Sequence, residues 1–109
     1  MKITLENNVK CILLPPNLDT QTSMSIEPEI LKFSGDETTK VLCDFSKTEY
    51  ISSFGLRIIL SLSKKINKSG GQIVLSSMSP SVYEVFKISG FAKIFKILDN
   101  KSLAIKELS

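Results

Sequence analysis

The chemistry that this sequence could carry is concentrated in a pair of neighbouring hydroxyl groups, Ser52 and Ser53, in the stretch YISSFGLRIIL. A short apolar run precedes the pair and helical spacing follows it, so the serines lie where an extended chain turns into a helix. Serine is a preferred N-cap there, since its hydroxyl accepts a bond from a first-turn N–H. The free amides and the helix dipole also favour an added anion. The pair is therefore either a plain helix cap or a phosphate acceptor.

The rest of the composition offers no second reactive centre. The chain contains no histidine, which excludes triads that use histidine as their base. Its two cysteines, Cys11 and Cys43, lie inside apolar runs, where a reduced thiol packs as a small hydrophobic group. Two thiols without histidine do not make a zinc site, and no loop of the kind that cradles nucleotide phosphates is present. We expect a protein that is not an enzyme and that has no metal or other cofactor.

Length, charge and hydrophobic content indicate one domain over residues 1–109. The chain is 42% hydrophobic, enough for a core of its own. No run approaches the roughly 18 apolar residues of a spanning helix, and the apolar region of the N-terminus is too short for a signal peptide, so we expect a cytoplasmic protein without membrane insertion. The net charge is +3 and the 14 basic residues are spread along the chain, which argues against direct nucleic-acid binding.

The elements that must position the serine pair alternate between strands and helices. Strands are predicted over short apolar runs at residues 3–5, 9–14, 40–45, 72–76 and 94–98, the first two forming a hairpin. Helices are predicted before Gly35, from the serine pair to Gly70, from Ser79 to Ser89, and over residues 100–108. Alternating strands and helices pair in parallel through right-handed crossovers. We therefore expect an α/β fold with a mixed sheet of four or five strands and about four helices packed on it.

Pro28 leaves two alternative starts for the first helix. Asp19, Thr22 and Ser23 are all possible caps. A start near Ser23 places Pro28 inside the helix, where it removes a backbone bond, whereas a start near Glu27 leaves only a short helix. We therefore expect a short or kinked helix.

Apolar spacing also predicts part of the hydrophobic core. The helix after the serine pair carries an apolar stripe that would face the sheet. The positions expected in the core are Cys43, Ile59, Leu60, Phe86, Ile88 and Phe91.

A family resemblance is carried by the stretch VLCDFSKTEYISSFGLRIIL and by KKINKSGGQIVLSSMSPSVYEVFKISGFAKIF after it. The chain resembles the STAS domain, the family of bacterial anti-sigma factor antagonists. Four motifs recur in the family's order: a serine two residues before Gly55-Leu56, Gly70-Gly71 before a strand, Ser79-Pro80 opening a helix, and Ile88-Ser89-Gly90-Phe91 closing it. The resemblance is strong over residues 40–99 and loose before them.

The resemblance implies an anti-sigma factor antagonist, a phosphorylation-switched binding module that takes part in transcription regulation. Unphosphorylated, it would capture an anti-sigma serine kinase that uses ATP and also holds a sigma factor. Gly55-Leu56 places Ser53 at the family's acceptor position; phosphorylation there would end the capture, and a serine phosphatase would reset the domain. The residues expected to contact the partner are Asp19, Ser52, Ser53, Phe54 and Arg57.

Two positions depart from the family pattern. Many members have aspartate before the acceptor, where this chain has Ser52, and a small residue after it, where this chain has Phe54. The Phe54 ring would either cover the site or anchor a partner, and Arg57 would pair a phosphate or a partner carboxylate, or stay solvated. Two other functions stay open: a non-phosphorylated STAS interaction subunit of a transport or sensory complex, and a small-ligand sensor.

Overall fold

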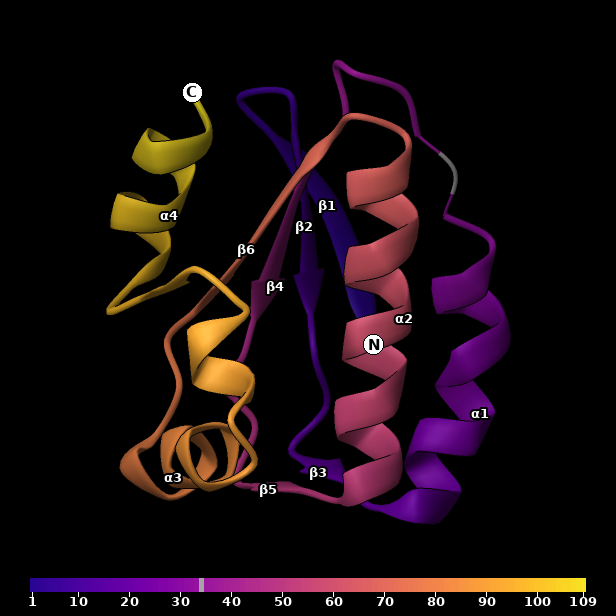
Figure 1. Ribbon diagram of the computed structural model, residues 1–109, viewed down its shortest axis with the longest axis vertical. Coiled ribbons are helices and arrows are strands. Elements are labelled where there is room, and N and C mark those ends of the chain that lie inside the picture. Colours follow the sequence, from indigo (N-terminus) through magenta and orange to yellow (C-terminus); the bar gives the residue numbers. More distant parts are fainter. Residues whose placement is uncertain (34) are drawn as a thin grey trace.

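A five-stranded mixed sheet forms the centre of the fold (Figure 1). The computed structural model describes residues 1–33 and 35–109. The sheet has the order β1-β2-β4-β6-β7, with β1 (Lys2–Glu6), β2 (Val9–Leu13), β4 (Lys40–Asp44), β6 (Gln72–Ser76) and β7 (Ile97–Leu98). β1 pairs antiparallel with β2, and the three later pairs are parallel. The predicted α/β architecture is confirmed.

Helices cover both faces of this sheet. They are α1 (Thr20–Leu31), α2 (Ser53–Lys68), α3 (Pro80–Ile88) and α4 (Lys101–Leu108), with a short 3-10 helix η1 (Phe91–Lys93) after α3. Figure 1 shows α1 and α2 on one side of the sheet and α4 on the other, with α3 beside the end toward which β2 and β4 point. None of the helices in the described part of the chain has the length and hydropathy of a membrane span.

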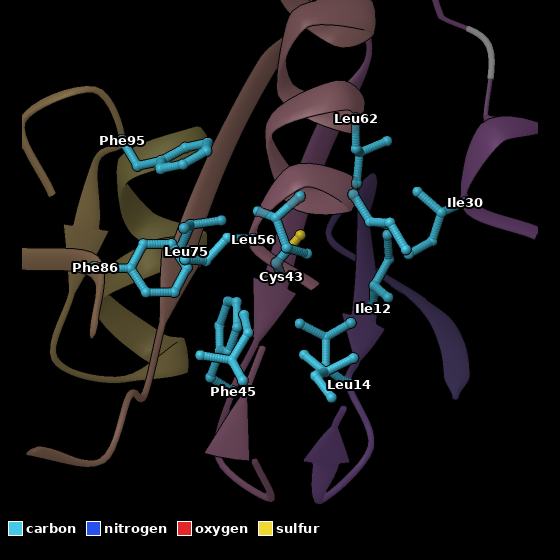
Figure 2. Packing of buried hydrophobic residues seen from close by; sticks show 14 of the residues in the cluster. Ile12, Leu14, Ile30, Cys43, Phe45, Leu56, Leu62, Leu75, Phe86 and Phe95 are labelled. Carbon is cyan, nitrogen blue, oxygen red and sulfur yellow. The ribbon is translucent and has the colours of Figure 1, made fainter. Parts of the chain in front are cut away.

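The hydrophobic core has two parts, one on each face of the sheet. The larger part lies under α1, α2 and α3, and at its α3 end Phe86 packs edge-to-face with Phe45 at 5.6 Å and with Phe95 at 5.9 Å between ring centroids (Figure 2). The smaller part lies under α4 and includes Cys11. Cys43 belongs to the larger part, so the two thiols face opposite sides of the sheet.

The predicted core positions are confirmed only in part. Cys43, Ile59 and Phe86 are buried, whereas Leu60 and Phe91 are half-buried. The prediction for Ile88 was wrong, because its side chain is 78% exposed. Ile88 follows Phe86 by two residues, and two residues at 3.6 per turn rotate a side chain to the opposite face of a helix.

The first helix is longer and begins earlier than expected. Asp19 is the N-cap, and its Oδ1 accepts a bond from the Thr22 N–H at 2.8 Å. The helix runs for 12 residues and ends at Leu31, with Pro28 inside it. Pro28 has no N–H to donate to the Met24 carbonyl, and both residues lie on the exposed side of the helix. Of the expectation of a short or kinked helix ending near Gly35, the short length and the end were therefore wrong, whereas Asp19 as one of the three possible caps is confirmed.

The last predicted strand is also shorter than expected. Residues 94–98 were predicted as a strand, but only Ile97–Leu98 pair, and they add to the edge of β6. η1 occupies the chain just before this segment. The apolar side chain of Phe95 fills the core beside Phe86 from irregular backbone, which an apolar run alone does not distinguish from a strand.

Candidate functional site

A second, two-stranded sheet positions the start of the two helices α1 and α2. β3 (Asn17–Leu18) pairs parallel with β5 (Tyr50–Ile51), with Leu18 opposite Ile51. Each strand leads directly into a helix, through Asp19 on one side and Ser52 on the other. The N-termini of α1 and α2 therefore lie side by side, at the end of the main sheet where its parallel strands finish (Figure 1). Sequence patterns did not predict this small sheet.

The loop that leads to β5 is hydrogen-bonded to Pro15 and Pro16, which lie between β2 and β3. Thr48 is 2% exposed, and its hydroxyl donates to the carbonyl of Pro15 at 2.9 Å. The Glu49 N–H donates to the carbonyl of Pro16 at 2.7 Å. These bonds hold β5 against the segment that precedes β3. Thr48 was missed as a positioning residue because a polar residue in a polar loop gives no sequence signal of its partner.

The two serines at the junction have different environments. Ser52 is 9% exposed; its hydroxyl accepts from the Gly55 N–H at 3.1 Å and donates to the carbonyl of Leu18 at 2.9 Å. Ser53 is the first residue of α2 and is exposed, and its hydroxyl makes no hydrogen bond to any described residue. Ser52 is therefore the helix cap, and the Ser53 hydroxyl is available to an outside reagent.

Gly55 allows the start of α2 to pack closely against its neighbours. A Cβ at this buried position would lie 3.0 Å from the carbonyl oxygen of Leu18 and 3.1 Å from the Ser23 hydroxyl oxygen. The first of these atoms is backbone, which cannot turn away as a side chain can. Glycine therefore lets the first turn of α2 pack against α1 and β3.

Phe54 and Arg57 form a contact on the outer surface of the first turn of α2. The Phe54 ring is half-buried and packs against the larger core. The Arg57 guanidinium lies over that ring, with its Cζ 5.2 Å from the centroid, a cation–π distance. Arg57 is exposed and follows Ser53 by four residues, so both lie on the same face of the helix. Arg57 thus carries a positive charge on the helix face that also bears Ser53.

The site has no sulfur nucleophile of its own. Burial raises the pKa of the Cys43 thiol to about 12, and burial also raises the pKa of the Cys11 thiol. Both therefore stay protonated near neutral pH. Among the described residues, no group of three or more His, Cys, Asp or Glu side chains is arranged to hold a metal ion.

Comparison with known proteins assigns the family. A family model described as the STAS domain matches residues 1–104. The chain belongs to the STAS domain family. BtrV of Bordetella bronchiseptica, which is named as a candidate anti-sigma factor antagonist, is 30% identical over 106 residues that cover 95% of this chain and 91% of BtrV. The anti-sigma F factor antagonist of Paenibacillus polymyxa is 28% identical over 116 residues that cover 99% of this chain and 95% of that protein.

Solved structures of STAS proteins superpose on nearly the whole chain. A candidate anti-sigma factor antagonist from Thermotoga maritima has a TM-score of 0.87 and 25% identity, and the alignment covers 98% of this chain and 92% of that one. A STAS domain protein from Planctomyces limnophilus has a TM-score of 0.89 at 22% identity, with 98% and 96% of the two chains covered, which supports the fold.

The predicted site residues of this STAS domain are brought to one end of the molecule. Asp19 and Ser52 cap the paired helices, while Ser53, Phe54 and Arg57 occupy the first turns of α2. Burial limits what Ser52 offers to a partner, and one oxygen of Asp19 is already occupied as a cap. Tyr50 in β5 is 55% exposed and lies two residues before Ser52. It was not predicted as part of this surface, because nothing in its spacing marks it.

Proposed function

We propose that this STAS domain is an anti-sigma factor antagonist whose binding to an anti-sigma serine kinase is switched by phosphorylation of Ser53. The observation that carries the proposal is the difference between the neighbouring serines. The Ser53 hydroxyl is exposed and unpartnered among the described residues, whereas the Ser52 hydroxyl is buried and makes two hydrogen bonds. Relatives that align over nearly the whole chain are named anti-sigma factor antagonists, which supports the partner class.

The proposed reaction is phosphoryl transfer from ATP in the kinase's active site. The Ser53 oxygen attacks the γ-phosphorus, the bond to the β-phosphate oxygen breaks, ADP leaves, and the hydroxyl proton passes to a base of the kinase. The STAS domain supplies an accessible hydroxyl and no catalytic group. Ser52 would have to give up a cap bond and a bond to Leu18 before it could react in this way.

The product is compatible with the fold. A phosphoserine carries about −1.5 to −2 charge near neutral pH and would sit on the first residue of α2, where unpaired N–H groups and the helix dipole favour an anion. Arg57, one turn further on, would add a cationic partner. We therefore expect folding to survive phosphorylation.

Binding to the kinase would not survive it. The unphosphorylated surface formed by Ser53, Phe54, Arg57 and the neighbouring Asp19 is proposed to dock on the kinase, and a dianion at its centre would have to lose its hydration without a prepared partner. A change of about 1–3 kcal/mol would alter the affinity roughly 5–150-fold. Capture of the kinase would free its sigma factor, phosphorylation would end capture, and a serine phosphatase would restore it.

The departure at Ser52 is compatible with this mechanism. Aspartate and serine are similarly good N-caps, because both place an oxygen where it accepts the first-turn N–H. Ser52 does so toward Gly55, and its hydroxyl proton adds a bond to Leu18 that an aspartate could not donate. The cap is thus retained without a carboxylate beside the acceptor.

The test compares the two serines directly. The wild-type chain, Ser53→Ala and Ser52→Ala are incubated with the cognate kinase and ATP, and the phosphate is mapped by mass spectrometry. We expect label at Ser53 in the wild type and in Ser52→Ala, and none in Ser53→Ala, which should still bind the kinase. Ser53→Asp should fold and bind weakly.

Two outcomes would contradict the proposal. Label that persists in Ser53→Ala and disappears in Ser52→Ala would move the acceptor to Ser52. A wild-type chain that binds a partner and never takes phosphate would instead indicate a non-phosphorylated interaction subunit.

A further inference from the structure

At the β1 edge of the main sheet, no strand among the described residues pairs with the outer side of β1. β1 is the terminal strand of the order β1-β2-β4-β6-β7, and all five of its residues are exposed. It pairs with β2 residue for residue from Lys2 to Glu6, without a bulge, and it contains no proline. Bulges and prolines commonly protect the edge strands of monomeric proteins, because the free backbone groups of an edge can pair with another strand. β1 has neither.

The hairpin geometry determines which backbone groups are free. Asn7 and Asn8 form a two-residue turn with φ values of 51° and 64°, as in a type I′ turn, and Glu6 is paired with Val9 across it. The pair that closes such a turn is a hydrogen-bonded one, and bonded positions alternate along the strand. The backbone groups of Lys2, Thr4 and Glu6 therefore face β2, and those of Ile3 and Leu5 face outward.

The side chains of β1 divide in the same alternating way. Ile3 and Leu5 lie on the α1 side of the sheet, opposite Ile12 and Lys10 of β2, and they are 45% and 70% exposed. They line a shallow groove toward α1 with Lys10, Glu29, Lys32 and Phe33. Lys2, Thr4 and Glu6 lie on the α4 side, where Glu6 pairs with Lys101 at 2.7 Å.

The charges of this strand are antisymmetric about its middle residue. Lys2 stands two residues before Thr4, and Glu6 stands two residues after it. Across an antiparallel two-fold axis through Thr4, each Lys2 would face Glu6 of the other copy. A strand with like charges at both ends would repel its own copy in that register, whereas this one attracts it.

We propose that β1 is a self-association edge, which pairs antiparallel with β1 of a second copy of this chain around a two-fold axis at Thr4. In this register Ile3 faces Leu5 of the other copy, and both present their free N–H and C=O groups, so the backbone pattern and the charge pattern agree. The two apolar grooves would merge on the α1 side into one covered surface. The interface includes none of the residues around Ser53, so it leaves the proposed phosphoacceptor site open.

The test is a charge exchange between copies, measured by sedimentation equilibrium of the full chain from micromolar to low-millimolar concentration. Lys2→Glu and Glu6→Lys each turn both facing pairs of a homodimer into like-charge pairs, and each should weaken self-association roughly tenfold. An equimolar mixture of the two variants should associate better than either variant alone, since every facing pair is again opposite in sign, but less well than the wild type, because Glu6→Lys also loses the pair with Lys101 of its own chain. Lys64→Glu, which makes the same charge change at an exposed position of α2, should have no effect.

A second measurement keeps the proposal testable without substitutions. In hydrogen-exchange experiments the amides of Ile3 and Leu5 should become more protected as the wild-type concentration rises, while that of Glu49, bonded to Pro16, should not change. A wild-type chain that stays monomeric over the whole range would overturn the proposal. So would a dimer that is insensitive to both charge variants, or a mixture that associates no better than either variant alone.

Discussion

Removal of the Ser52 hydroxyl tests the cap assignment most directly. In Ser52→Ala the Leu18 carbonyl keeps the bond from the Ser52 backbone N–H at 2.8 Å, so the main loss is the partner of the Gly55 N–H. Loss of an N-cap serine costs about 0.5–2 kcal/mol, and a buried N–H left without a partner costs about 1–3 kcal/mol. Both ranges describe the same lost bond and are not summed. We therefore expect the free energy of unfolding to fall by about 2 kcal/mol.

The assay is urea denaturation followed by far-ultraviolet circular dichroism, with Ser53→Ala as the matched control. The exposed Ser53 hydroxyl is unpartnered among the described residues, so its removal should change the unfolding free energy by less than about 0.5 kcal/mol. Ser52→Asp retains a cap acceptor and should recover most of the loss. A loss below about 0.5 kcal/mol in Ser52→Ala, or an equal loss in Ser53→Ala, would refute the assignment of cap and acceptor.

Three further predictions concern the core and the turn around the site. Ile59→Ala should lower the unfolding free energy by roughly 2–5 kcal/mol in urea denaturation. Leu60→Ala should lower it clearly less, because Leu60 is only half-buried; equal decreases would contradict the burial described. Phe54→Ala should lower the melting temperature because the ring packs on the core, and should also weaken kinase binding by more than about 1 kcal/mol in a titration if the ring anchors the partner. An unchanged affinity would leave Phe54 as a cover of the turn alone. The pKa of Cys43, about 12, lies above the usual thiol value, so the folded state keeps the thiol proton to a higher pH than the unfolded state does. The free energy of unfolding should therefore fall as pH rises above about 9, by at most about 1.4 kcal/mol per pH unit. Cys43→Ala should flatten that alkaline slope, and an unchanged slope would contradict the burial effect.

Local residues determined several element boundaries. Asn7-Asn8 specified the hairpin turn, Ser79-Pro80 the start of α3, and Gly70, at a φ of 88°, the end of α2. Each of these signals acts on backbone within a few residues, through a cap bond, a fixed φ or freedom to adopt a positive φ, so no knowledge of distant contacts is needed. The motif order around Gly55-Leu56 was equally local, and the family was recognised from it.

Tertiary structure decided what local spacing could not. Both serines were acceptable caps in the sequence, and the choice of Ser52 depends on the Leu18 carbonyl, 34 residues away, which β3 brings beside β5. The exposure of Ile88 and the half-burial of Phe54 likewise depend on which face of each helix meets the sheet. A two-residue strand such as β3 has too little pattern to be seen in a sequence, yet its pairing aligns the two helix N-termini. The free hydroxyl of Ser53 follows from that pairing, because the same contacts that bury Ser52 leave its neighbour on the outer side of the turn.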